Sequence, residues 1–141
     1  MAIQFFEEEI KFQLKEKNKH KKWLKKIAEE GGYSIGEINY VFCSDEYLHQ
    51  KNLEYLNHDT LTDIITFDNS EGDNKIEADI FISIDRVIDN SQRMDILFET
   101  ELLRVMSHGI LHLMGYKDKK EEEVLKMRKM EEVCIHHFQN M

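Results

Sequence analysis

The stretch that decides the fold is DILFETELLRVMSHGILHLM, residues 95–114. Its apolar residues recur at helical spacing and form a stripe wide enough for a mostly buried helix. They are Leu97, Leu102, Val105, Met106, Leu111 and Leu113. Gly115 follows directly and is placed to end the helix. The sequence therefore predicts a long central helix over residues 95–114.

Short stretches before this helix are rich in β-forming residues. They predict strands over residues 2–6, 38–42, 62–67 and 76–83, with a turn at 72–74 joining the last two. Strands early in the chain and helices late predict an α+β fold, a small mixed sheet packed with helices.

Helical spacing also appears outside the central segment. It predicts a helix over residues 16–31 with Trp23, Leu24 and Ile27 toward the core, and another over 46–56 that Ser44 and Asp45 are suited to cap. A last helix carries Val124, Met127, Met130, Cys134 and Phe138, spaced three or four apart.

Length and composition indicate one soluble domain over residues 1–141. The chain has 41% hydrophobic and 33% charged residues, with no proline, repeat or low-complexity linker that would mark a boundary. No stretch is long and apolar enough to cross a bilayer, and the N-terminus lacks the features of a signal peptide. The sequence therefore predicts a cytoplasmic protein without membrane partners, in which Cys43 and Cys134 are reduced core thiols.

His108 and His112 lie four residues apart near the end of the central helix. Both imidazoles therefore project from one face, about one turn apart. A zincin helix with the HExxH pattern presents two ring nitrogens to zinc in this way. Two partly buried, hydrogen-bonded histidines would have the same spacing, so the pair by itself makes these residues candidate metal ligands only.

Asp118 follows His112 by six residues, after Gly115 has allowed the chain to fold back over the histidines. Two neutral imidazoles and one carboxylate form a catalytic zinc shell with a fourth position open for water, whereas a structural zinc would use more cysteine. Asp118 and Glu121 also form an Asp-x-x-Glu arrangement suited to capping the last helix. On spacing alone, ligand and cap are about equally supported.

Gly109 stands where HExxH enzymes carry the glutamate that acts as general base. The pattern is therefore not that of an ordinary zincin peptidase. The general base is therefore unknown from the sequence: either it comes from elsewhere in the chain, or a metal-bound water on the His108, His112 and Asp118 site acts without one.

The segment HGILHLMGY, residues 108–116, closely resembles the signature of the YbeY family of bacterial endoribonucleases. Met127 and Glu131 fall where that family has a methionine and a glutamate on its closing helix. Two upstream blocks, which contain Asn52, Tyr55, Asp59 and residues 62–67, then Asp79, Ile80 and Ser83, also resemble the family. The resemblance covers residues 38–135, and the histidine block is its most specific part.

This resemblance implies an α+β metallohydrolase with one zinc ion per chain and single-strand-specific endoribonuclease activity. It implies a role in small-subunit (16S) rRNA maturation and ribosome quality control, with ribosomal RNA and the small ribosomal subunit as partners. It places the third ligand at Asp118, where most members have histidine, and so favours ligand over cap. Iron, nickel or manganese suit the same ligands, and the oligomeric state stays open.

Two features oppose RNA binding. Leu56 stands where the family usually has an arginine that is thought to face the RNA, so a phosphate contact is missing. The formal net charge is −9, whereas nucleic-acid-binding proteins usually carry a positive excess.

Other cations are candidates to replace this contact. Lys15, Lys19, Lys22 and Lys26 would share one face of the predicted helix, although a solvated helix face accounts for them equally well. Arg104 is the other candidate. It shares a helical face with Glu101 and His108, and an exposed ion pair between Arg104 and Glu101 is the simpler expectation.

The working mechanism has zinc lower the pKa of a bound water, with attack on phosphorus by hydroxide or by the ribose 2′-hydroxyl. Two rival hypotheses remain open. One is another metal-dependent hydrolase such as a peptidase, which Gly109 opposes. The other is a ribosome-associated RNA-binding factor with a structural zinc and weak catalysis, which Leu56 and the net charge favour.

Overall fold

The computed structural model describes residues 2–56, 62–72 and 74–141, and for Leu56 it describes the backbone only. Within these residues the strands form one mixed sheet in the order β1-β2-β4-β3. They are β1 (Ala2–Glu8), β2 (Ser34–Cys43), β3 (Ile64–Asp68) and β4 (Lys75–Ser83). β2 pairs in parallel with both β1 and β4, and β3 pairs antiparallel with β4. The predicted α+β fold with a small mixed sheet is confirmed.

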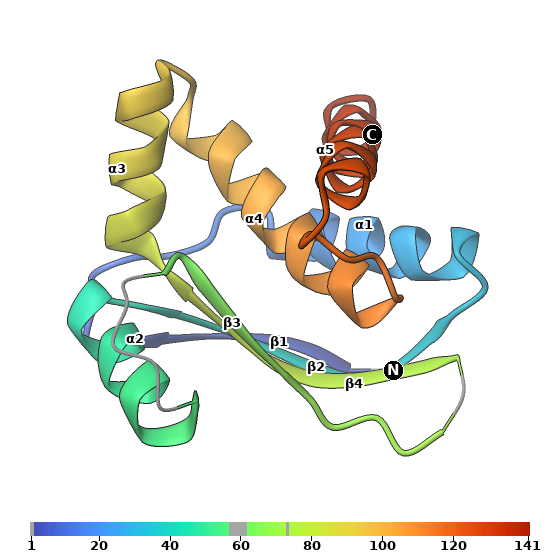
Figure 1. Ribbon diagram of the computed structural model, residues 1–141, viewed down its shortest axis with the longest axis horizontal. Coiled ribbons are helices and arrows are strands. Elements are labelled where there is room, and N and C mark those ends of the chain that lie inside the picture. Colours follow the sequence, from blue (N-terminus) through green and yellow to red (C-terminus); the bar gives the residue numbers. More distant parts are fainter. Residues whose placement is uncertain (1, 57–61, 73) are drawn as a thin grey trace.

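Most of the helices cover one face of this sheet (Figure 1). On that face lie α1 (Lys17–Glu30), α3 (Ile84–Met94), α4 (Phe98–Leu113) and α5 (Glu121–Gln139). The short helix α2 (Asp45–Lys51) continues into the π-helical turn η1 (Asn52–Leu56) at one end of the sheet. The hydroxyl oxygen of Ser44 accepts a hydrogen bond from the Tyr47 amide, so Ser44 caps α2 as predicted.

The predicted central helix begins too early in the sequence. Asp95 has a φ angle of 55° and ends α3, and α4 begins only at Phe98. Leu97, expected in the buried stripe, precedes α4 and is 71% exposed. The apolar periodicity did not reveal this break, because the break depends on one left-handed residue, and aspartate is among the few residue types that tolerate that conformation.

The main core lies between the sheet and the four helices above it. Alternate side chains of β2 and β4 are buried there, with Tyr40 and Ile80 fully enclosed. α1 contributes Trp23, Leu24 and Ile27, as predicted. The Trp23 indole N–H donates to the carbonyl oxygen of Cys134 at 2.7 Å, which joins α1 to α5.

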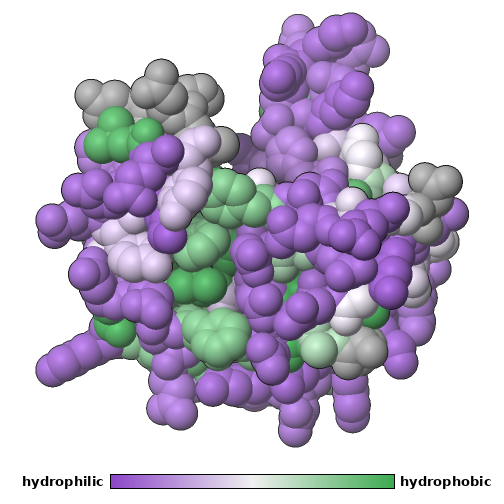
Figure 2. Space-filling model, turned by 90° about the horizontal axis from the view of Figure 1, so that it is seen from below, coloured by the Kyte–Doolittle hydropathy of each residue, from purple (hydrophilic) through white to green (hydrophobic). Residues whose placement is uncertain are grey.

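The opposite face of the sheet is only partly covered. There Leu48 of α2 is buried with Cys43 and Ile65 in a second, smaller apolar cluster, with Phe67 and Phe81 at its edge. Figure 2 shows this face from below, with apolar side chains near its centre and hydrophilic ones around them. Both cysteines are free and buried, which agrees with the prediction of core thiols.

Two contacts set the position of α4 on the sheet. The hydroxyl of Tyr40 in β2 donates to the carbonyl oxygen of Met106, and Gly109 lies so close to the sheet that an added Cβ would be 3.0 Å from Ile64 Cδ1. The C-terminal end of α4 therefore lies over β3 and β4. Among the helices of the described residues, none combines the length and apolar character needed to cross a membrane.

Candidate metal centre

His108 and His112 project from the same side of α4, with ring centroids 4.8 Å apart. The Nε2 atom of each ring lies 3.3 Å from Oδ2 of Asp118. Ligand atoms from the three residues all lie within 4.8 Å of one another, and no other such group of His, Cys, Asp or Glu occurs in the described residues. The structure thus brings the three predicted ligands together in a group that could hold a metal ion.

The donor set fits zinc. Two imidazole nitrogens and one carboxylate oxygen are the donors found in catalytic zinc sites. The side chains of His108, His112 and Asp118 are 17%, 36% and 37% exposed, so the site opens to solvent and leaves room for a further ligand.

The turn after α4 brings Asp118 to the histidines. Gly115 has a φ angle of 99°, a conformation that glycine adopts without steric penalty, and its amide donates to the carbonyl oxygen of His112. The Tyr33 hydroxyl donates to the carbonyl oxygen of Met114 at 3.0 Å and holds the start of the turn. The predicted end of the helix at Gly115 is confirmed.

The alternative of a helix cap at Asp118 is wrong. The N-cap position of α5 is occupied by Lys120, two positions later, and its side chain does not cap the helix there. The Lys120 amide donates to Glu123 Oε1 at 2.9 Å, while the Asp118 carboxylate faces the histidines. Spacing could not separate the two arrangements, because the chain after Gly115 extends further before α5 begins.

A hollow of about 570 Å³ lies between the histidines and the edge strand β3. His108, His112 and Asp118 line it, together with Asn52, Thr62, Asp63, Ile64, Ile65, Thr66, Asp68 and Leu113. Asp63 and Asp68 add two carboxylates to that of Asp118, and no lysine or arginine is among the described lining residues. The hollow is therefore polar and acidic.

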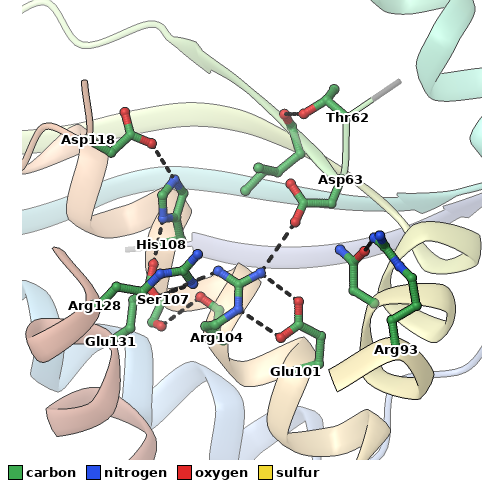
Figure 3. A network of polar contacts seen from close by, with 12 residues as sticks. Thr62, Asp63, Arg93, Glu101, Arg104, Ser107, His108, Asp118, Arg128 and Glu131 are labelled. Carbon is green, nitrogen blue, oxygen red and sulfur yellow. Dashed lines mark hydrogen bonds and ion pairs between the residues drawn. The ribbon is translucent and has the colours of Figure 1, made fainter. Parts of the chain in front are cut away.

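Behind His108 lies a network of buried charges, shown in Figure 3. His108 Nδ1 is 2.6 Å from Oε2 of Glu131, a residue of α5 that is 1% exposed. Arg104 donates two hydrogen bonds to Glu101, from Nε at 2.7 Å and from Nη2 at 2.6 Å. Its other contacts are longer, with Nη1 3.6 Å from Glu131 Oε1 and Nη2 3.5 Å from Asp63 Oδ2.

The expectation of an exposed Arg104–Glu101 ion pair is wrong. Glu101 is completely buried and the Arg104 side chain is 18% exposed. Burial alone would lower the pKa of Arg104, but its hydrogen bonds to Glu101 and the charges of Glu101, Glu131 and Asp63 raise that pKa above its usual value. The pattern of a single helix cannot reveal such burial, because it depends on the elements that pack against that helix, here α3 and α5 among others.

Sequence reasoning missed the contact between Glu131 and His108. A signal was present, because Glu131 lies four residues after Met127 and three before Cys134, and both of those residues are buried. A carboxylate at a core position of an amphipathic helix has to find a partner. No comparable pattern in the sequence indicates that Asp63 lines the hollow.

The predicted RNA-contacting lysines lie on or before α1. Lys15 precedes α1, whose left-handed N-cap is Glu16, so the four lysines do not share one helical face as predicted. Lys22 and Lys26 are exposed, and Lys19 lies 4.3 Å over the ring of Phe138. None of these lysines lines the hollow beside His108, and neither does Arg104. The Leu56 side chain and Asp59 lie outside the described residues.

Comparisons with known proteins agree along nearly the whole chain. The family model described as Endoribonuclease YbeY matches residues 2–139. The protein named Endoribonuclease YbeY from Cytophaga hutchinsonii is 53% identical over 134 residues, which cover 95% of this chain and 94% of that one. The protein of the same name from Flavobacterium johnsoniae is 49% identical, covering 94% and 95%.

The fold has a solved counterpart. The solution structure of a Thermotoga maritima protein is similar with a TM-score of 0.66 and 25% sequence identity, and the match covers 98% of this chain and 92% of that one. With the family match over residues 2–139 and relatives near 50% identity over almost their whole length, the chain belongs to the YbeY family of endoribonucleases.

Proposed function

We propose that this protein is a metal-dependent endoribonuclease that cuts single-stranded RNA in the hollow beside His108, His112 and Asp118. The observation that carries the proposal is the convergence of both histidine Nε2 atoms on Asp118 Oδ2 at the wall of that hollow. The names of the relatives support RNA as the substrate. Those proteins are called endoribonucleases, and they match nearly the full length of this chain.

In this proposal one zinc ion is held by His108, His112 and Asp118. The donor types support zinc, although iron, nickel and manganese bind the same donors. The chemistry that such an ion supplies is Lewis acidity toward a phosphoryl oxygen of the RNA backbone.

The residues around the site supply position and proton transfer. Asp63 and Asp68 line the hollow opposite the histidines, and we infer that one of them takes the proton from the attacking hydroxyl group. Their negative charges also repel a phosphate, so RNA is expected to enter the hollow only when a cation offsets them.

The wider role proposed is maturation of 16S rRNA and ribosome quality control in the cytoplasm, with the small ribosomal subunit as partner and residues 1–141 acting as one domain. The relatives' names support the RNA part of this role. The peptidase alternative is not favoured, since a side chain at Gly109, the position of the zincin glutamate, would press on Ile64 and Ile80. Family membership likewise disfavours a factor with only a structural metal.

The test is cleavage of a fluorescent single-stranded RNA and of a matched duplex. Zinc-loaded wild type is expected to cut the single strand, and chelator-treated protein and a His112→Ala variant are expected to lose this activity by at least about 100-fold. Product ends identify the nucleophile, since a 2′,3′-cyclic phosphate means attack by the ribose hydroxyl. Equal cutting by wild type and His112→Ala would show contaminating nuclease and remove the proposal.

A further inference from the structure

We infer that Glu131 and Arg104 are positioning residues for the metal. Glu131 fixes the tautomer and orientation of His108, and Arg104 holds Glu131 in place from the neighbouring helix. This inference rests on the metal site of the proposed function and adds to it the residues behind the ligands that set metal affinity.

The contact between Glu131 and His108 selects one of the two forms of the neutral imidazole ring. A carboxylate only accepts hydrogen bonds, so the Nδ1 atom 2.6 Å from Glu131 Oε2 must carry the hydrogen. Nε2 then keeps its lone pair, and Nε2 is the atom that faces Asp118. Glu131 therefore leaves free the nitrogen that a metal at this site would use.

Burial fixes the orientation of the Glu131 side chain in this contact. Glu131 is 1% exposed, and its carboxylate is held from both ends, with Oε2 on His108 and Oε1 near Arg104 and Arg128. A side chain enclosed in this way has few other positions open to it. The orientation of the His108 ring is consequently fixed in the metal-free protein.

Arg104 connects this contact to the body of α4. Its guanidinium group forms a two-pronged pair with Glu101, which is fully buried one turn before it on the same helix. The same guanidinium group also forms ion pairs with Glu131, through Nη1, and with Asp63 at the hollow, through Nη2. Figure 3 shows Arg104 among these three carboxylates, which come from α4, α5 and the residue just before β3.

A role in stability alone does not explain the arrangement. Buried ion pairs are a weak source of stability, because removing charges from water offsets most of the attraction between them. A carboxylate–histidine–metal series, by contrast, has a defined use, and loss of the outer carboxylate typically lowers metal affinity about 10- to 100-fold. The chain Glu101–Arg104–Glu131–His108 ends at a ligand atom of the proposed site.

The test compares zinc affinity of folded wild type, Glu131→Gln and Arg104→Lys by competition with a chromophoric chelator. Glutamine keeps the shape of glutamate, but its amide can either accept from Nδ1 or donate to it, so it no longer selects a tautomer. We expect Glu131→Gln to bind zinc about 10- to 100-fold more weakly. Arg104→Lys is expected to weaken binding in the same direction, because lysine lacks the planar fork that joins two carboxylates.

A second readout needs no metal. Long-range ¹H–¹⁵N NMR of metal-free protein, at a pH where the ring is neutral, should find the His108 proton on Nδ1 in wild type and shared between both nitrogens in Glu131→Gln. Asp45→Asn is the matched control, because Asp45 forms a two-pronged pair with Arg86 on α3 and does not line the hollow. It is expected to lower stability and leave zinc affinity unchanged.

Unchanged zinc affinity and an unchanged Nδ1 proton in Glu131→Gln would overturn the inference, as would an equal loss of affinity in Asp45→Asn. If Arg104→Lys does not fold, Glu131→Gln decides the matter alone. Wild type that binds zinc but leaves RNA intact removes only the proposed function, whereas wild type that takes up no metal removes both.

Discussion

The phenolic hydroxyl of Tyr40 donates a hydrogen bond to the carbonyl oxygen of Met106 over 3.0 Å. Tyr40 lies in β2, Met106 lies in α4 two residues before His108, and both are fully buried. This bond therefore ties the helix that bears the histidines to the centre of the sheet.

The variant Tyr40→Phe is expected to lose roughly 1 kcal/mol of free energy of unfolding, the usual net worth of one buried hydrogen bond. Urea unfolding of the metal-free protein measures this loss. Zinc affinity of the folded variant should match wild type, because Tyr40 does not line the hollow beside the three ligands. A variant with normal stability and weakened zinc binding would contradict this account of the bond.

Asp118 is expected to be needed for zinc binding and not for the stability of α5, the helix that follows it. In Asp118→Ala, bound zinc measured by mass spectrometry should fall from about one equivalent to well below that. The metal-free variant should unfold within about 0.5 kcal/mol of metal-free wild type, since Asp118 lies outside the N-cap position of α5 and is partly exposed. Full retention of zinc, or a loss above 1 kcal/mol in the metal-free state, would restore the capping role.

The pattern of the sequence predicted the parts of this site that depend on local geometry. His108 and His112 lie on the same face of any α-helix that contains both. Gly115 can end a helix because glycine adopts a positive φ angle without steric penalty. The Glu131–His108 contact joins residues 23 positions apart, so only the packing of α5 on α4 defines it. The burial of Glu101 also depends on tertiary packing, which the pattern of α4 alone does not reveal.

The fold divides in a similar way. β4 was predicted at residues 76–83 and runs from Lys75 to Ser83, because alternation follows from one buried face. β2 was predicted too short, at residues 38–42, and runs from Ser34 to Cys43. The start of α4 was predicted at residue 95, but α4 begins at Phe98, because the left-handed residue Asp95 ends α3 and the periodicity of the sequence does not show this. Which strands are neighbours, β1-β2-β4-β3, is set by long-range pairing that no local pattern encodes.

The pair of Asp45 and Arg86 should give the protein an acid-sensitive component of stability. Burial alone would raise the pKa of Asp45, but the hydrogen bonds from Arg86 and Ser83 lower it below its ordinary value of 3.8. A carboxyl group with a lowered folded-state pKa stabilises the fold above the unfolded-state value, and that stabilisation is lost as the pH falls through the folded-state value.

Asp45→Asn should therefore be about 1 kcal/mol less stable than wild type near neutral pH, with the difference shrinking below pH 3.8. Urea midpoints across pH 2.5 to 7 measure it, in metal-free protein so that the zinc ligands do not contribute. A difference that stays constant over this range would mean that Asp45 acts through packing and not through its charge.

Cys43 and Cys134 are expected to be inert in the native protein. Each is at most 3% exposed, and burial raises the pKa of each thiol to about 12. Because the thiolate is the reactive form, an aromatic disulfide reagent at pH 8 should react only as fast as the protein unfolds, and two thiols should appear at once in denaturant. A thiol that titrates within seconds in native conditions would show that one of these sites opens locally.

Gly109 marks the point at which the zincin pattern and this fold are incompatible. A Cβ at this position would lie 3.0 Å from Ile64 Cδ1 and 3.4 Å from Ile80, with apolar atoms on both sides. Gly109→Glu, which writes the HExxH pattern into the chain, should bury a carboxylate without a partner and lower the free energy of unfolding by several kcal/mol. It should give no peptidase activity.

The variant Gly109→Ala tests whether steric crowding by the side chain, without an unpaired buried carboxylate, is enough to destabilise the protein. The nearest atom is the flexible end of Ile64, which needs to move a few tenths of an ångström, and alanine favours the helix over glycine by about 1 kcal/mol. The two effects nearly cancel, so this variant should melt close to wild type while Gly109→Glu unfolds, as thermal denaturation would show. If Gly109→Glu instead melted like wild type, residue 109 would have to face solvent, and α4 would present His108 and His112 to a different surface.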